Sequence, residues 1–131
     1  MGGIISRYYI KNGGQSKIYK LITIASPHYG VRDLLNFASI FGSAEESKQM
    51  QPNSDFLNSL NNPIDSLVPS YTISGKTVQK NTCFSAPCDC VVYVDYSKLK
   101  TATASMVFTG DQYEHNSIVN QPEIAKQALN F

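Results

Sequence analysis

The sequence predicts an α/β fold built around a small parallel sheet. Three short segments are rich in β-branched and aromatic residues, which favour strands: Lys17–Ala25, Ser70–Ser74 and Ala104–Thr109. Helical segments separate them, and a turn residue closes each one: Pro27, Gly75 and Gly110. Strands joined through helical segments pair in parallel, so all three are expected in one sheet.

A helix is predicted ahead of the first strand. Five apolar residues recur there at helical spacing: Met1, Ile4, Ile5, Tyr8 and Tyr9. Gly13-Gly14 follows where such a helix would stop. No strand precedes this helix in the sequence, so the first strand is expected to offer an unpaired edge.

A helical insertion is predicted between the first and second strands. A helix begins near Asp33 and carries an apolar face: Leu34, Phe37, Ala38 and Phe41. A shorter helix over about 55–60 has Asn53 or Ser54 as its cap and ends at Asn61-Asn62-Pro63. Three of its residues are expected to face inward: Phe56, Leu57 and Leu60.

The second half of the chain holds the remaining helices. Lys76–Cys90 is predicted to be a polar loop, and Tyr96–Leu99 one helical turn. Asn120 is expected to cap a last helix over about 121–130. Pro122 lies near the first turn of that helix, where its missing N–H costs nothing.

Length and composition exclude several classes of protein. With 131 residues and 42% hydrophobic residues, the chain can form a single domain with a core. Its 11 basic and 10 acidic residues leave a net charge of +1, which argues against a nucleic-acid partner. The longest apolar run, around Leu21–Ala25, is far shorter than the ~20 residues of a transmembrane helix. The first residues also lack the pattern of a secretory signal.

Two chemically capable residues follow neighbouring strands. His115 comes shortly after the third predicted strand, and Asp89 lies in the loop after the second. In a parallel sheet both positions fall at the carboxyl edge, where α/β folds assemble their sites. A carboxylate beside a histidine fixes the imidazole tautomer and stabilises the imidazolium during proton transfer. We therefore expect Asp89 and His115 to meet in space.

Five segments, in this order, resemble the α/β-hydrolase lipases and esterases. Met1–Ile10 is similar to the helix after the nucleophile elbow, and Leu21–Gly30 to the next strand and its Ser-Pro-His-x-Gly turn. Met50–Asn61 resembles a Pro-x-Ser-x-Phe-Leu-x-x-Leu-Asn segment of the helical region that covers the site. Cys88–Ser97 resembles the loop with the catalytic acid, and Asn120–Ile124 the opening of the last helix.

The resemblance implies roles for individual residues. Asp89 matches the catalytic acid and His115 the catalytic histidine. Met1-Gly2-Gly3 is similar to the second half of a Gly-His-Ser-Met-Gly-Gly elbow, so the nucleophilic serine would directly precede Met1. The backbone nitrogen of Met1 would then belong to the oxyanion hole. Asp95 is the alternative acid, although it matches a later, helix-opening acidic position of the family.

The same resemblance implies that residues 1–131 are the C-terminal part of a single α/β-hydrolase domain. This part would contain the last three parallel strands, their flanking helices and a cap-like or lid-like insertion over about 31–66. Ser6 lies inside the first helix and Ser117 lacks a strained turn, so neither is expected to replace the missing nucleophile. The chain alone is therefore expected to be inactive.

The expected activity is hydrolysis of carboxylic esters, with acylglycerols as a candidate substrate class. The partner would be a small ester or lipid, in solution or at a lipid interface, and a serine mechanism needs no cofactor or metal. Two alternatives remain. The chain could be a non-catalytic binding or scaffold domain derived from a hydrolase, or a small cysteine-rich zinc module.

Three cysteines surround the candidate acid, and their state is left open by the sequence. A disulfide from Cys83 to Cys88 or to Cys90 would pin the acid loop and imply an oxidising compartment, whereas reduced thiols would fit the cytosol. Cys90 stands where the family has a glycine, so a positive φ there would cost about a kcal/mol. His28 is interpreted as a turn-packing residue that bonds to its neighbours.

Overall fold

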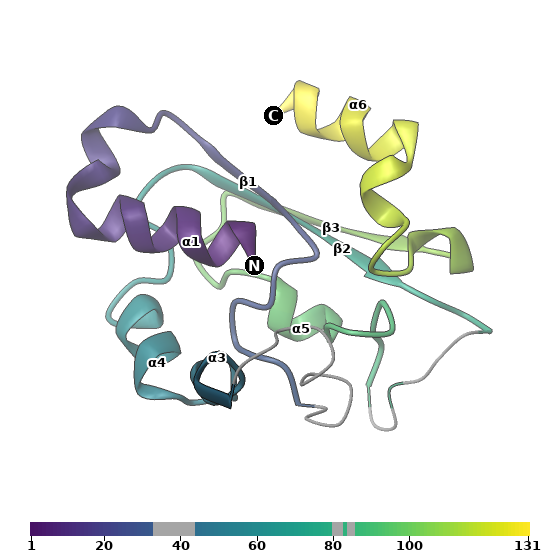
Figure 1. The fold of residues 1–131 in the computed structure, drawn as a ribbon. Helices are drawn as coiled ribbons and strands as arrows, with labels where there is room; N and C mark the ends of the chain where they lie inside the picture. The colour runs from purple at the N-terminus through teal and green to yellow at the C-terminus, as the bar shows by residue number, and fades with distance from the viewer. Residues whose placement is uncertain (33–43, 80–82, 84–85) are drawn as a thin grey trace.

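The computed structural model describes residues 1–32, 44–79, 83 and 86–131, and these form a parallel three-stranded sheet with helices on both sides (Figure 1). The strands are β1 (Leu21–Ile24), β2 (Ser70–Lys76) and β3 (Ala104–Thr109), in the order β1-β2-β3. Both neighbouring pairs are parallel, which confirms the predicted α/β class.

Two of the strands differ from their predicted bounds. β1 begins at Leu21 and not at Lys17, because Gln15–Lys17 form a 3-10 turn and β1 pairs with β2 only from Leu21 onward. β2 continues through Gly75 to Lys76, because both residues pair with β3. Gly75 is thus inside the strand, and the prediction that it closes the strand was wrong. β3 has the predicted bounds.

The first helix and the end of the insertion form as predicted. Helix α1 (Gly2–Tyr9) runs into a turn over Ile10–Gly14, where Gly13 has a φ of 103° and ends the helical path. Helix α4 (Asp55–Asn61) is capped by Ser54, whose Oγ accepts from the backbone nitrogen of Leu57 at 3.3 Å. Helix α3 (Ala44–Gln49) precedes α4.

The other helical predictions had different outcomes. The helix expected from Asp33, with Leu34, Phe37, Ala38 and Phe41, lies outside the described residues. The helical turn expected over Tyr96–Leu99 is found at α5 (Val94–Ser97). The last helix, α6 (Pro122–Asn130), has Gln121 at its N-cap, because Asn120 belongs to the 3-10 turn that precedes it. Within the described residues, none of the helices is long and apolar enough to cross a bilayer.

The two faces of the sheet differ in chemistry. On one face, which we call the apolar face, large side chains pack under α6 with Tyr113, Ile118 and Ile124: Ile22, Ile24, Tyr71, Ile73 and Phe108. The opposite face, which we call the hydroxyl face, carries buried hydroxyl groups: Thr23, Ser70, Thr72 and Ser74. Helices α1 and α5 cover the hydroxyl face, on the other side of the sheet from α6 (Figure 1).

Polar side chains of the first helical segment hold the end of the insertion. Arg7, Lys11 and Gln15 are four residues apart, and each donates to backbone carbonyls between positions 59 and 67. A second apolar cluster fills the space between α1, α4 and the loops beside them: Ile4, Val31, Met50, Leu57, Leu60 and Val92. Helix α4 is therefore fastened to α1 by both hydrogen bonds and packing.

Candidate functional site

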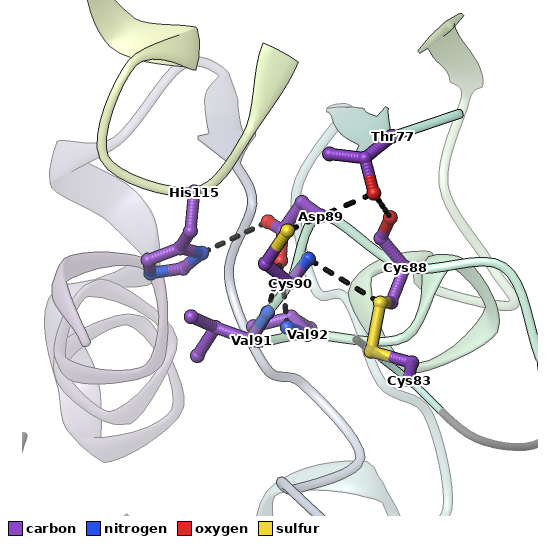
Figure 2. Close-up of a disulfide and its surroundings, with 8 residues drawn as sticks. All are labelled: Thr77, Cys83, Cys88, Asp89, Cys90, Val91, Val92 and His115. Atoms are coloured by element: carbon purple, nitrogen blue, oxygen red, sulfur yellow. Dashed lines mark hydrogen bonds and ion pairs between the residues drawn. A yellow bond between two sulfur atoms is a disulfide. The ribbon is translucent and has the colours of Figure 1, made fainter. Parts of the chain in front are cut away.

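The residues expected to meet do meet at the carboxyl edge of the sheet. His115 Nδ1 lies 2.9 Å from Asp89 Oδ2, and the backbone nitrogen of His115 donates to the carbonyl of Asp89 at 2.8 Å (Figure 2). Asp89 is 1% exposed, whereas the His115 side chain is 26% exposed. The carboxylate is thus buried behind an imidazole that solvent can reach.

The Asp89 carboxylate is fixed by its own turn. Its Oδ1 accepts from the backbone nitrogens of Val91 and Val92, at 3.0 and 2.7 Å. The other oxygen, Oδ2, faces His115. A carboxylate accepts hydrogen bonds and donates none when it is ionised, so His115 carries its proton on Nδ1. Within the described residues, the hydrogen bond of the His115 ring is made at Nδ1, and none is found at Nε2.

The loop that carries Asp89 is cross-linked next to the acid. Cys83 and Cys88 form a disulfide, which settles the choice between Cys88 and Cys90. Figure 2 shows the disulfide and the His115 ring on opposite sides of Asp89. The disulfide takes up two of the three cysteines that the zinc-module alternative would use, and no cluster of metal-binding residues occurs in the described part of the chain.

Cys90 has the backbone conformation that usually requires glycine. Its φ is 78°, where a Cβ costs about a kcal/mol, as anticipated from its place beside the acid. Its backbone nitrogen lies 3.3 Å from Cys88 Sγ, and its own sulfur lies 3.7 Å from Thr77 Oγ1. The turn therefore keeps a glycine-like path although a side chain is present.

The loop that carries His115 is tied to β2 and to α6. Gly110, with a φ of 147°, turns the chain out of β3, and its nitrogen donates to the carbonyl of Lys76 at 2.9 Å. Tyr113 packs on Phe108 and donates its hydroxyl to Glu123 Oε1 at 2.5 Å. The hydrogen bond to Glu123 raises the pKa of the Tyr113 phenol. These contacts hold the backbone just before His115.

The amino end of α1 lies at the same edge of the sheet. Gly3 packs directly on Ser26, which follows β1, and Ile4 shares an apolar cluster with Val92 of the Asp89 turn. Burial lowers the pKa of the terminal amine of Met1. The first turn of α1 thus adjoins the loops that follow β1 and β2.

The alternative acid, Asp95, and the two serines, Ser6 and Ser117, make their contacts with residues other than His115. The Asp95 side chain is 85% exposed and lies 3.9 Å from Lys98. Ser6 donates to the carbonyl of Gly2 within α1, and Ser117 donates to Glu114. The pairing of an acid with His115 involves Asp89 and not Asp95.

His28 belongs to a buried polar cluster, as its interpretation as a packing residue requires. Arg7 donates to its Nδ1 at 3.2 Å, so its Nε2–H donates to Thr23 Oγ1 at 2.9 Å. Burial and the Arg7 charge lower the pKa of His28 to about 3, so the ring is neutral. Sequence reasoning missed Arg7 and Asp65 in this cluster, because nothing local distinguishes them from surface residues.

Asp65 anchors the other side of that cluster. Its carboxylate accepts from the hydroxyls of Tyr29 and Thr101 and from the backbone nitrogens of Lys100 and Thr101. Burial alone would raise the pKa of Asp65, but these hydrogen bonds outweigh burial and lower it. The polar groups of Arg7, His28 and Asp65 bond to partners inside the protein, and Arg7 gives the cluster a positive charge. We therefore infer that the cluster stabilises the fold.

The fold is similar to that of a known lipase. Bacillus licheniformis lipase BlEst2, in its mature form, superposes with a TM-score of 0.62 at 20% identity, over 98% of this chain and 61% of that structure. No family model matches the sequence, and no curated protein does. The chain therefore has a partial α/β-hydrolase fold and spans 61% of the length of the lipase.

Proposed function

We propose that Asp89 and His115 are the acid and the base of a serine-dependent hydrolase of carboxylic esters, acylglycerols among them. The observation that carries this proposal is the 2.9 Å contact between His115 Nδ1 and a buried carboxylate, at the carboxyl edge of a parallel sheet. The fold shared with a lipase supports it. The nucleophile would be a serine that directly precedes Met1.

Each half of the pair has a defined chemical task in this proposal. His115 Nε2 takes the proton of the serine hydroxyl as that oxygen attacks the ester carbonyl. It then returns the proton to the leaving alcohol, and water repeats the cycle on the acyl-enzyme. Asp89 holds the imidazole with Nδ1 protonated and stabilises the imidazolium, because its own position is fixed by Val91 and Val92.

The oxyanion of the tetrahedral intermediate would be held at the start of α1. If a serine precedes Met1, the nitrogen of Met1 would be a peptide N–H at the N-terminus of α1, where the partial positive charge of the helix would add to its effect. In the chain that begins at Met1 this nitrogen is an amine. Without the serine and this amide, we expect residues 1–131 alone to be inactive.

Residues 1–131 would then form the C-terminal part of one hydrolase domain, with residues 31–66 as its cap. The hydrogen bonds from Arg7 and Lys11 attach the later part of this insertion to α1. The Cys83–Cys88 disulfide suits an oxidising compartment.

The test is to express the protein with the residues that its gene encodes ahead of Met1. We expect a serine immediately before Met1 and measurable hydrolysis of p-nitrophenyl butyrate. Asp89→Asn and His115→Ala should each lower kcat at least about a thousandfold. Asp95→Asn is the matched control and should stay within about twofold. A residue other than serine before Met1, without hydrolysis, would indicate a non-catalytic binding or scaffold domain.

A further inference from the structure

Gly75 interrupts the apolar face of β2 at the point where the two catalytic loops cross it. Side chains alternate along a strand, so Tyr71, Ile73 and residue 75 point to the same face. The first two are large and buried, and a third apolar side chain would continue the pattern. Glycine inside a strand often marks a place where another backbone comes very close.

The space beside Gly75 is already filled by the two loops. A Cβ built on Gly75 would overlap the carbonyl oxygen of Tyr113, and it would lie 3.1 Å from Asp89 Cβ and 3.2 Å from Ile118 Cδ1. Tyr113 is two residues before His115. Gly75 therefore touches the acid loop and the histidine loop at once.

Several contacts tie Tyr113 to the rest of its loop, so its backbone does not shift alone. The Tyr113 backbone nitrogen donates to Gly110 at 3.0 Å, and the Tyr113 side chain is held by Phe108 and Glu123. A methyl group at position 75 would force the Tyr113 carbonyl back by about an ångström to restore ordinary contact. That movement would shift His115 relative to Asp89, whose carboxylate is held by its own turn.

We infer that Gly75 is a positioning residue: its missing side chain sets the separation of the loops that carry Asp89 and His115. Its meaning for catalysis rests on the proposed function. The geometric part does not, because a displaced loop would break the His115 Nδ1 to Asp89 contact whether or not an ester is ever cleaved. A displacement of about an ångström takes a 2.9 Å contact out of hydrogen-bond range.

The experiment measures the His115 tautomer by ¹⁵N NMR in the 131-residue chain at a pH where both imidazoles are neutral. The chain has only two histidines, so the spectrum is simple and His115→Gln assigns it. In the unmodified chain the Nδ1–H form should exceed the Nε2–H form at least about tenfold, because a hydrogen bond to a charged group is strong. Asp89→Asn provides the reference for a broken pair.

Gly75→Ala should lose the Nδ1–H preference as Asp89→Asn does, while the His28 signals stay in place and report an intact sheet. Gly2→Ala is the matched control, since a Cβ there meets nothing within 4 Å, and it should keep the unmodified spectrum. A Gly75→Ala chain with the original tautomer would overturn the inference. So would a Gly75→Ala chain that fails to fold while Asp89→Asn folds, because glycine would then serve folding and not the pair.

This readout separates the inference from the proposed function. If the extended protein hydrolyses no ester but Gly75→Ala changes the tautomer, Gly75 still positions the pair and only the enzymatic assignment fails. If the extended protein is an active esterase and Gly75→Ala keeps both the tautomer and kcat, the enzymatic assignment stands and the role of Gly75 is refuted.

Discussion

The apolar face and the hydroxyl face of the sheet are covered in different ways. Under α6, the apolar face is held by buried area, through side chains such as Ile73 and Ile124 that are at most 1% exposed. Under α1, the hydroxyl face meets a cluster in which Arg7, His28 and Asp65 are buried and linked by hydrogen bonds. Packing of apolar surface does not select one particular neighbour, whereas each hydrogen bond joins a particular donor to a particular acceptor.

This difference matters for the candidate site, which draws on both sides. The loops with Asp89 and His115 cross the end of the apolar face at Gly75. The amino end of α1, where the nucleophile is proposed to enter, lies on the hydroxyl face against Thr23 and Ser26. The polar cluster behind α1 thus holds one part of the site in place, and packing under α6 holds the other.

The largest effect is expected from removing the cation of the polar cluster. Arg7→Met keeps the apolar stem but removes the donor from the backbone carbonyls of Asp65 and Leu60, from Asn61 Oδ1 and from His28 Nδ1. We expect the free energy of unfolding to fall by about 3–5 kcal/mol in urea titrations, because uncompensated buried polar groups are costly. The control, Arg32→Met at an exposed position, should cost under about 1 kcal/mol. Equal losses in Arg7→Met and Arg32→Met would show that the buried hydrogen bonds of Arg7 do not stabilise the hydroxyl face.

A smaller loss is expected on the apolar face, where neighbours can relax into the gap. Ile124→Ala deletes a side chain that is 1% exposed and should lower the free energy of unfolding by about 2–4 kcal/mol. Leu129→Ala, on the same helix but 88% exposed, should change it by about 0.5 kcal/mol or less. An Ile124→Ala variant as stable as Leu129→Ala would mean that α6 does not cover the sheet as described.

The contrast also explains what the sequence could and could not predict. Elements of the apolar face follow from local pattern: β3 was bounded correctly because its β-branched and aromatic residues end at a glycine. The Asp89 and His115 positions followed from their places after strands. Arg7 and Asp65 gave no local signal, because the partners of their side chains lie 21 to 58 residues away in the chain. Gly75 was misread for the same reason, since its neighbours come from later loops.

Lowering the pH should reduce the free energy of unfolding through His28, which belongs to the polar cluster on the hydroxyl face. The pKa of His28 is about 3 in the folded chain and about 6.5 when unfolded, so the unfolded chain binds more protons between these values. The stabilising contribution is complete above pH 6.5 and is lost as the pH falls. From pH 7 to pH 5 we expect a loss of about 2 kcal/mol.

His28→Gln should remove most of that dependence, and urea titrations of both chains across this range provide the measurement. The lowered pKa of Asp65 acts in the same direction but below its ordinary value of 3.8, outside the chosen window. An unchanged slope in His28→Gln would show that His28 is not the group that takes up the proton.

The finest comparison lies between two hydroxyls on the same face. Thr23 and Thr72 are cross-strand partners, and both are buried. Thr23 Oγ1 accepts from His28 at 2.9 Å, whereas no described residue bonds Thr72 Oγ1. Valine has nearly the same shape as threonine, so the two Thr→Val variants differ mainly in the hydrogen bond that is lost.

Thr23→Val should cost about 1–2 kcal/mol, because it leaves the buried Nε2–H of His28 without an acceptor. Thr72→Val should be neutral or stabilise by a few tenths of a kcal/mol, because it removes a buried hydroxyl whose desolvation nothing repays. Urea titrations of the two variants side by side measure the difference. If both cost the same, the hydroxyl face is held by shape alone, and the fixed partners of its polar cluster do not set the position of α1.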